Sequence, residues 1–300
     1  MLPERVAASD AELDVLGVHI HMLDETAALG RIEQLHDLGP PGFVSYVNPN
    51  TVNLAFGDPA FVATLACADV RLADGFGIRI AARRQGVRVP AILNGSDFNA
   101  AVLRRAAARG WPVFLLGGQS PVAERAAQRL SERIAGLRVV GTQHGFFTEG
   151  ETDAVVERVR ASGATVLMVA LGQPRQERWL VRHLARTGAR VGLGVGGFLD
   201  FSAGAVRRAP AWMNRAGLEW TYRLAQEPRR LAHRYLIGTP VFLARTLRPG
   251  ATNGKLAPAP PSAELVWAIG GERLRSPVRQ GGEGRRHWRD ARSTGYAGLS

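Results

Sequence analysis

The chain has 300 residues, 46% of them hydrophobic, which excludes a disordered chain and is enough for one large domain or two small ones. Its formal net charge of +12 is uneven: residues 1–204 hold 21 Lys and Arg against 20 Asp and Glu, a net +1, and residues 205–300 hold 17 against 6, a net +11. This distribution excludes an evenly basic protein and predicts that the basic end meets an anionic surface or ligand.

Short apolar runs alternate with helical patterns up to about residue 204. The predicted strands are residues 14–20, 43–48, 112–118, 137–142, 165–172 and 190–197. The predicted helices are residues 24–37, 96–110, 121–134, 151–163 and 176–188, the second of them capped by Ser96 and Gly110. Several strands are nearly continuous apolar runs, which is typical of burial on both faces. We therefore expect residues 1–204 to form a three-layer, Rossmann-like α/β sheet with helices on both faces.

The pattern changes after this α/β body. Residues 205–249 show only helical patterns, broken by Pro210, Pro228 and Pro240, and are expected to form a basic helical appendage. Residues 250–300 are rich in Pro, Gly and Arg and have no sustained period. Such a composition predicts a mostly disordered tail.

Polar residues gather in the loops that follow the predicted strands, where open α/β sheets bind their ligands. The loop after residues 43–48 carries Asn48, Asn50 and Thr51, which either contact a ligand or only start a helix. In the next loop Asp74 precedes Gly75. An aspartate there is either a helix N-cap or a general base.

Two further loops combine glycines with amides. After residues 112–118, the run of Gly117, Gly118 and Gln119 would let a phosphate approach the backbone at a helix start. In "LGQPRQERW", Gly172, Gln173 and Gln176 place two amides in the turn that opens a helix, and Asp200 follows the last strand. The first of these loops matches neither the dinucleotide-binding nor the P-loop pattern, so alone it is weak evidence of a nucleotide site. The second is the stronger signal, because two glutamines beside Pro174 are hard to explain by packing.

Several patterns of metal and nucleophile chemistry do not occur. The sequence contains no HExxH, CxxC, GxSxG or Asp-x-Asp, and His19 and His21 alternate along one strand without a third ligand. We therefore expect neither a metal nor another cofactor.

The sequence also bears on location. Residues 1–14 are acidic and polar, unlike a signal peptide, and the single cysteine, Cys67, fits a reducing compartment. No apolar run reaches the roughly 18 residues of a membrane-spanning helix. We expect a protein that is cytoplasmic, or peripheral on the cytoplasmic, inner face of the membrane.

Taken in order, the motifs resemble the WecG/TagA/CpsF glycosyltransferases. "NPNTVN", "ADGFGI", "NGSDF", "LGQPRQERW", "GVGGFLDFSAG" and "GLEWTYRL" carry this resemblance, which covers roughly residues 15–247. It implies an inverting, metal-independent hexosyltransferase that moves a sugar from a UDP-sugar to a polyprenyl-diphosphate-linked sugar in bacterial cell-surface or exopolysaccharide synthesis.

The resemblance also implies roles for single residues. Asp74 is the expected general base, and Arg223 and Arg230 are expected to complete the catalytic site. The candidate substrate-binding residues are Asn48, Asn50, Thr51, Asp97, Gly117, Gly118, Gln119, Gly172, Gln173, Gln176, Asp200 and Arg234. Two departures from the family pattern, Tyr46 and Ile92, lie near the expected sugar site. They leave the donor open between an N-acetylmannosamine type and glucose.

The appendage is expected to make two contacts. On one helix, Arg230 and Arg234 would each lie within about 20° of Arg223, a basic stripe suited to a diphosphate or merely to solvent. The apolar stretch 235–249, flanked by Arg245 and Arg248, is suited to the headgroup region of an anionic membrane.

Two other functions stay open on the sequence alone. A basic nucleic-acid-binding protein would explain the charge but not the neutral body. A Rossmann-type oxidoreductase would explain the glycine loops but lacks the ribose-binding acid. We expect no nucleic-acid partner and leave open whether the chain forms a homo-oligomer.

Overall fold

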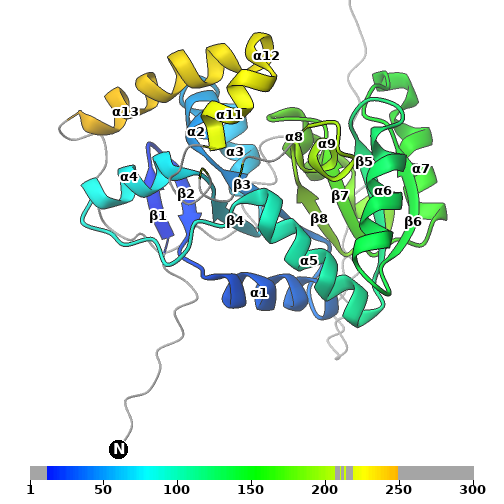
Figure 1. The fold of residues 1–300 in the computed structure, drawn as a ribbon. Coiled ribbons are helices and arrows are strands. Elements are labelled where there is room, and N and C mark those ends of the chain that lie inside the picture. The colour runs from blue at the N-terminus through cyan, green and yellow to red at the C-terminus, as the bar shows by residue number, and fades with distance from the viewer. Residues whose placement is uncertain (1–11, 207–209, 211–212, 214–218, 249–300) are drawn as a thin grey trace, which may run out of the picture. The chain divides into compact units, whose positions relative to one another are not determined.

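The computed structural model describes residues 12–206, 210, 213 and 219–248, without the side chains of Arg223 and Arg230. The predicted tail, residues 250–300, lies outside the described residues. The described part contains one eight-stranded sheet of order β1-β2-β4-β3-β8-β7-β5-β6 (Figure 1). Only β1 and β2 are antiparallel, and the other neighbours are parallel.

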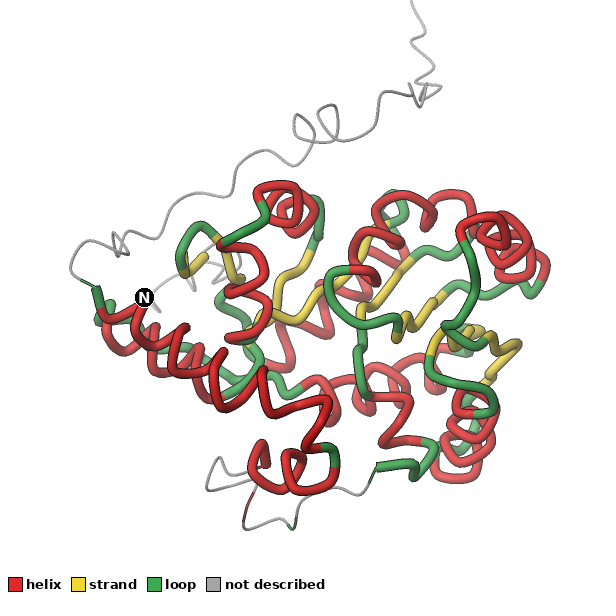
Figure 2. Tube along the Cα trace, turned by 90° about the horizontal axis from the view of Figure 1, so that it is seen from above, coloured by secondary structure: helices red, strands yellow, loops and turns green. Residues whose placement is uncertain are grey.

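Helices cover both faces of this sheet (Figure 2). The strands are β1 Glu12–Val15, β2 Val18–His21, β3 Gly42–Val47, β4 Val70–Ala73, β5 Pro112–Gly117, β6 Arg138–Gln143, β7 Val166–Ala170 and β8 Val191–Gly194. The helices are α1 Glu25–Asp37, α2 Pro49–Phe56, α3 Pro59–Ala66, α4 Phe76–Arg84, α5 Gly95–Arg109, α6 Val122–Arg133, α7 Thr152–Ala161, α8 Arg175–Thr187, α9 Phe198–Ser202, α11 Glu219–Gln226, α12 Pro228–Ala232 and α13 Thr239–Leu247. A 3-10 turn spans Glu149–Glu151, and a π-helical segment, His233–Gly238, joins α12 to α13. The predicted three-layer α/β fold is confirmed.

Strand residues alternate between two cores. Leu115 and Met168 face the core beneath α1, α5, α6 and α9, while Phe114 and Leu167 face the core beneath α7 and α8. Successive side chains of a strand point to opposite faces, so a strand buried on both sides must be apolar throughout. This explains the continuous apolar runs in the sequence.

The first predicted strand is wrong. Residues 14–20 do not form one strand but turn between β1 and β2, with positive φ at Leu16 (55°) and Gly17 (84°). The Gly17 N–H donates to Asp14 Oδ1 at 2.9 Å, which closes the turn. The turn has only two residues and lies inside an apolar stretch, so the apolar pattern of the sequence shows no break between the two strands.

One predicted helix cap is confirmed and one is wrong. Gly110 ends α5 in the left-handed conformation, with φ 67°. Ser96 does not begin that helix, because Asn94 is the N-cap and accepts a hydrogen bond from the Ser96 N–H at 3.0 Å. Pro228 follows the break between α11 and α12, as expected, and both Pro228 and Pro240 lie in the first turns of helices, α12 and α13, where no backbone N–H is needed.

The last helix of the appendage packs on α2 and α4 of the body. Phe242 of α13 is 0% exposed and belongs to the same apolar core as Val52 of α2 and Ile78 of α4. Asn53 of α2 donates to the Gly238 carbonyl at 2.6 Å and accepts from Arg245 Nη1 at 2.9 Å. The appendage is thus anchored on the two helices that follow β3 and β4.

Candidate active site

The candidate site lies at the carboxyl ends of the parallel strands. β3, β4, β5, β7 and β8 run in the same direction, so the loops that leave them open at one edge of the sheet. Asn48, Asp74, Gly118, Gly172 and Gly196 are in these loops.

Asn48 starts a helix and also contacts the candidate general base. It is the N-cap of α2: its Oδ1 accepts from the Asn50 N–H at 3.0 Å and from the Thr51 N–H at 3.2 Å. Its Nδ2 donates to Asp74 Oδ2 at 3.2 Å. The oxygen of the amide therefore starts a helix, and the nitrogen holds the candidate general base.

Asp74 follows β4 and is not a helix cap. The N-cap of α4 is Gly75, with φ 83° and no side-chain hydrogen bond to the helix, so the N-cap interpretation of Asp74 is wrong. The start of α4 is crowded: a Cβ on Gly77 would lie 2.4 Å from Pro49 Cγ. Close packing of α2 and α4 thus holds Asn48 and Asp74 together.

The amides of the loop after β7 are part of a buried network. Gln173 donates from Nε2 to the Tyr46 carbonyl at 3.0 Å and accepts at Oε1 from the Thr51 hydroxyl at 2.9 Å. Gln176, which is 1% exposed, accepts at Oε1 from the Gly196 N–H at 3.2 Å. These two glutamines join the ends of β3, β7 and β8.

The structure also reveals Glu177, which the sequence reasoning missed. Its carboxyl group is fully buried, and its Oε1 accepts from Gln176 Nε2 at 2.9 Å. Burial raises the pKa of Glu177, against the effect of hydrogen bonds from Gln176, Gln173 and Ser45. In the sequence this residue looks like an ordinary acid in the first turn of a surface helix, and only the fold buries it.

Close packing explains why glycine stands at the end of β5. A Cβ on Gly117, where φ is 139°, would lie 2.4 Å from the Ala170 carbonyl oxygen of β7. Gly118 accepts at its carbonyl from the Gly145 N–H at 2.8 Å, which brings the loop after β6 to this edge. Gln119 is exposed beside them.

That loop presents an aromatic side chain. Phe146 is 68% exposed. Arg175 of α8 holds the loop by donating to the Gly145 carbonyl at 3.0 Å and to the Phe147 carbonyl at 3.1 Å. The sequence reasoning did not single out Phe146.

The other candidate residues lie on helices next to the same edge. Asp97 is in the first turn of α5, whose start is tied to β4 by the Leu93 N–H donating to the Ala73 carbonyl at 2.9 Å. Asp200 is in α9. Arg234 lies in the π-helical segment, with its guanidinium carbon 5.4 Å from the centre of the Tyr235 ring.

The two arginines that the sequence predicts to be catalytic can be placed only by their backbone. Arg223 lies in α11 and Arg230 in α12, while their side chains lie outside the described residues. They are therefore not on one continuous helix, because Glu227 separates α11 from α12. The expected alignment of Arg223, Arg230 and Arg234 on a single helical face is wrong.

Both departures from the family pattern are packing positions. Tyr46 is 5% exposed, and its hydroxyl donates to Asn99 Oδ1 at 2.6 Å. Burial, and then the negative charge of Asp74, raise the pKa of the Tyr46 phenol, which marks the two side chains as neighbours. Ile92 packs against the core that contains Phe242.

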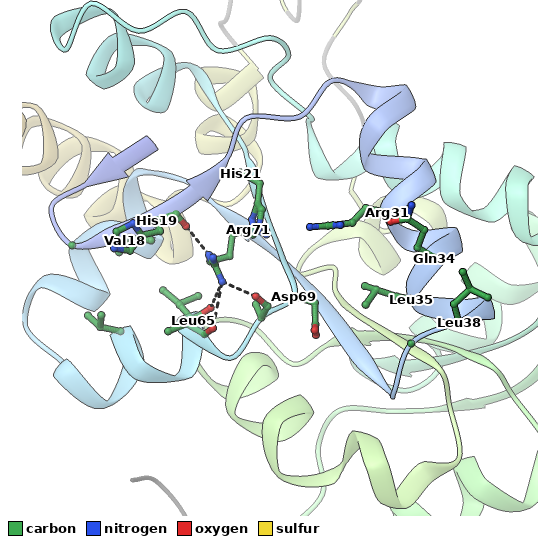
Figure 3. A pocket seen from close by; sticks show the side chains of 15 residues that line it. Val18, His19, His21, Arg31, Gln34, Leu35, Leu38, Leu65, Asp69 and Arg71 are labelled. Atoms are coloured by element: carbon green, nitrogen blue, oxygen red, sulfur yellow. Dashed lines mark hydrogen bonds between the residues drawn. The ribbon is translucent and has the colours of Figure 1, made fainter. Parts of the chain in front are cut away.

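A cavity lies at the opposite edge of the sheet. β2 and β4 pair only through His21 and Leu72. A cavity of about 600 Å³ lies between the unpaired parts of these two strands (Figure 3). Arg71 spans the gap by donating to the carbonyls of His19 at 2.8 Å and Ala68 at 2.6 Å. The cavity is at the amino ends of the strands, away from Asp74.

Neither a metal cluster nor a membrane span occurs in the described part of the chain. Among residues 12–206, 210, 213 and 219–248, no three His, Cys, Asp or Glu side chains are grouped as metal ligands. His21 instead lies with its Nε2 3.2 Å from Glu12 Oε1. No helix in these ranges is long and apolar enough to cross a membrane.

Comparison with known families decides between the open functions. The model of the glycosyl transferase WecG/TagA/CpsF family matches residues 13–255, which include the sheet and the helices up to Leu247. The chain belongs to this family. The WecG/TagA/CpsF enzymes are glycosyltransferases of cell-surface polymer synthesis that take a sugar-nucleotide donor and a lipid-linked acceptor. Membership sets aside the oxidoreductase and the nucleic-acid-binding protein.

Proposed function

We propose that this chain is an inverting, metal-independent hexosyltransferase. It moves a sugar from a UDP-sugar, with glucose or an N-acetylmannosamine type as the donor sugar, to a polyprenyl-diphosphate-linked sugar. The observation that carries the proposal is the place of Asp74: a carboxylate at the carboxyl edge of the sheet, with Asn48 Nδ2 3.2 Å from its Oδ2. A fixed carboxylate of this kind is suited to general-base catalysis.

Inversion follows from a single in-line displacement at the anomeric carbon. Asp74 takes the proton of the acceptor hydroxyl as that oxygen forms its bond to the anomeric carbon. The bond from that carbon to the β-phosphate oxygen breaks on the opposite face, and its electron pair leaves with UDP. One bond forms, one breaks, and the proton stays on Asp74.

Cations of the appendage are proposed to stabilise the leaving diphosphate. Guanidinium groups bind phosphate oxygens with two donors, which suits Arg223 and Arg230 to this role, with Arg234 beside them. The packing of α13 on α2 and α4 supports the proposal, because these helices begin just after Asn48 and Asp74. The appendage is thus attached next to the candidate base.

The nucleotide is proposed to lie over the loops after β5 and β6. The Gly118 loop leads into α6, whose first backbone N–H groups suit a diphosphate. Phe146 is 68% exposed at the same edge, and an exposed aromatic ring suits stacking on a uracil base. Gln119, exposed between them, is within the proposed nucleotide surface.

We propose that the appendage also contacts an anionic membrane. Leu236 and Ile237 are 59% and 53% exposed, and Leu247 is 45% exposed. Phe56, 54% exposed, lies next to them on α2, with the Arg245 guanidinium carbon 4.1 Å from its ring centre. Apolar side chains next to arginine favour the headgroup region on the inner face of the plasma membrane.

The decisive experiment removes the charge of Asp74. We expect Asp74→Asn to lose at least about 100-fold in turnover, because a positioned general base contributes roughly 100- to 10,000-fold. UDP affinity, measured by calorimetry, should stay near that of the wild type. Release of UDP is followed with UDP-glucose, UDP-N-acetylmannosamine and UDP-N-acetylglucosamine and short-chain lipid-linked acceptors. Wild-type turnover in Asp74→Asn would contradict the assignment.

A further inference from the structure

A buried carboxyl group lies beneath the candidate active site. Glu177 is in the first turn of α8 and is 0% exposed. Its Oε1 accepts hydrogen bonds from the Ser45 hydroxyl at 3.3 Å, from Gln173 Nε2 at 3.3 Å and from Gln176 Nε2 at 2.9 Å. A carboxylate removed from water is costly unless donors of this kind replace the water. Three donors that converge on one oxygen stabilise the ionised form.

This carboxylate determines which way both glutamine amides face. Glu177 Oε1 accepts from both amide nitrogens, so the two nitrogens turn toward Glu177 and the two amide oxygens turn away. Gln173 Oε1 then accepts from the Thr51 hydroxyl at 2.9 Å, and Gln176 Oε1 accepts from the Gly196 N–H at 3.2 Å. One oxygen atom thereby joins the loops after β3, β7 and β8.

The same hydrogen bonds lead to the candidate base. The Thr51 hydroxyl, which donates to Gln173, also accepts from the Asn48 backbone N–H at 3.1 Å. The Asn48 side chain in turn donates from Nδ2 to Asp74 Oδ2 at 3.2 Å. The path from Glu177 to Asp74 therefore runs through three side chains and is continuous.

We propose that Glu177 is a positioning residue whose carboxylate fixes the amides of Gln173 and Gln176 and, through Gln173, keeps Asn48 beside Asp74. The inference rests on the proposed function, because it gives Glu177 a part in the transfer step. Glu177 has no exposed surface and cannot touch the substrate. Its effect therefore falls on turnover, through the groups that it orients.

Glu177→Met tests this role with little change of shape. Met has no oxygen to accept from the two amide nitrogens, so neither amide is held in its orientation. We expect kcat to fall about 10- to 100-fold and KM for the UDP-sugar to stay within about threefold, since a 1 Å misplacement of a catalytic group costs about 100-fold. A role in folding alone would leave kcat per folded molecule unchanged.

Trp179→Phe is the matched control. Trp179 lies two residues further along α8, is 6% exposed and has an Nε1 without a hydrogen-bond partner. Both variants are assayed well below their midpoints of thermal unfolding, so loss of packing in α8 is common to them. If Glu177→Met keeps the kcat of Trp179→Phe, the positioning role is overturned.

A second readout needs no substrate. In ¹H–¹⁵N spectra of the full chain, the side-chain NH₂ signals of Gln173 and Gln176 should be protected from exchange in the wild type and in Trp179→Phe, and lose protection in Glu177→Met. Unchanged signals in Glu177→Met overturn the inference. A wild type that transfers no sugar overturns the proposed function instead, and the spectra then still decide whether Glu177 orients the amides.

Discussion

Asn48 uses the two ends of its amide for different partners. Its oxygen caps α2, and its nitrogen donates to Asp74. Asp caps a helix about as well as Asn, so Asn48→Asp should keep stability within about 1 kcal/mol. It removes the donor to Asp74 and places a like charge beside it, so we expect turnover to fall at least about tenfold.

The matched control for that variant is Asp24→Asn. Asp24 is the N-cap of α1 and accepts from the Ala27 N–H at 2.8 Å, far along the chain from the site loops. This exchange between the same two residue types should leave both stability and turnover near the wild type. Equal turnover in Asn48→Asp and Asp24→Asn would contradict the role of the Asn48 amide nitrogen.

His21 makes the fold sensitive to acid. Burial, and then the Arg71 charge, lower the pKa of His21 from 6.5 to about 3. The unfolded chain binds the proton more tightly than the folded chain. The contribution of neutral His21 to the free energy of unfolding is therefore fully present above pH 6.5 and is lost as pH falls toward 3, at about 1.4 kcal/mol per pH unit. His21→Gln cannot titrate, so its stability in urea should fall less steeply between pH 6 and 4. Equal slopes for both proteins would contradict this cause.

Two helical glycines should respond in opposite ways to the same substitution. A Cβ on Gly77 of α4 would lie 2.4 Å from Pro49 Cγ, whereas a Cβ on Gly30 of α1 would meet nothing within 4 Å. We expect Gly77→Ala to destabilise by about 1–3 kcal/mol through overpacking. Gly30→Ala should stabilise by about 0.5–1 kcal/mol through helix propensity. Urea unfolding measures both, and a stabilised Gly77→Ala would contradict the close packing of α2 and α4.

At the scale of elements, sequence patterns succeeded where burial is uniform along a segment. Strand β7 was predicted because both of its faces are buried, so every residue is apolar. Strand β4 has only four residues, one of them Arg71, whose charge is compensated by Glu12 from β1. A buried pair between distant segments has no local signature, so β4 looked like a loop.

The same reasoning explains which part of the candidate site was predictable. Asn48 follows a predicted strand, and topology alone brings strand ends together. Asp74 follows β4, which was not predicted, so its role rested on the family resemblance. Glu177 follows Gln176 in a helix with a typically charged first turn, and its burial depends on β3 packing over α8. The place of the site could therefore be predicted, but not the network beneath it.

The exposed apolar residues of the appendage should decide membrane binding. Leu236 and Ile237 lie in the π-helical segment beside α13. Phe242 of α13 is buried in the core and is not free to contact a membrane. Replacing both with Asp should lower sedimentation with anionic vesicles by at least about tenfold, since each buried side chain contributes about 1.5–3 kcal/mol. Leu38→Asp is the control, because Leu38 is 84% exposed but borders the cavity at the opposite edge. Equal loss in both variants would contradict a localised membrane surface.

At the scale of the whole molecule, the charge is divided between two parts. The near-neutral body, a net +1 over residues 1–204, carries the candidate base, and the appendage carries Arg223 and Arg230 within a region of net +11. An enzyme that neutralises its leaving diphosphate with a metal needs acidic ligands, whereas one that uses arginine needs a basic element close to the site. The attachment of α13 to α2 and α4 favours the second arrangement.

This arrangement has a measurable consequence. Turnover of the dialysed enzyme should be the same in EDTA and in Mg²⁺. Arg223→Ala and Arg230→Ala should each lower turnover about 100- to 1,000-fold, because each removes a preorganised donor to a developing anion. Added Mg²⁺ should rescue neither variant. Arg229→Ala is the control, because Arg229 is the exposed neighbour of Arg230 on α12 and changes the net charge equally. Loss of turnover in EDTA would show that a metal stabilises the leaving group. Equal losses in Arg229→Ala and Arg230→Ala would show that bulk charge, rather than these two arginines, does so.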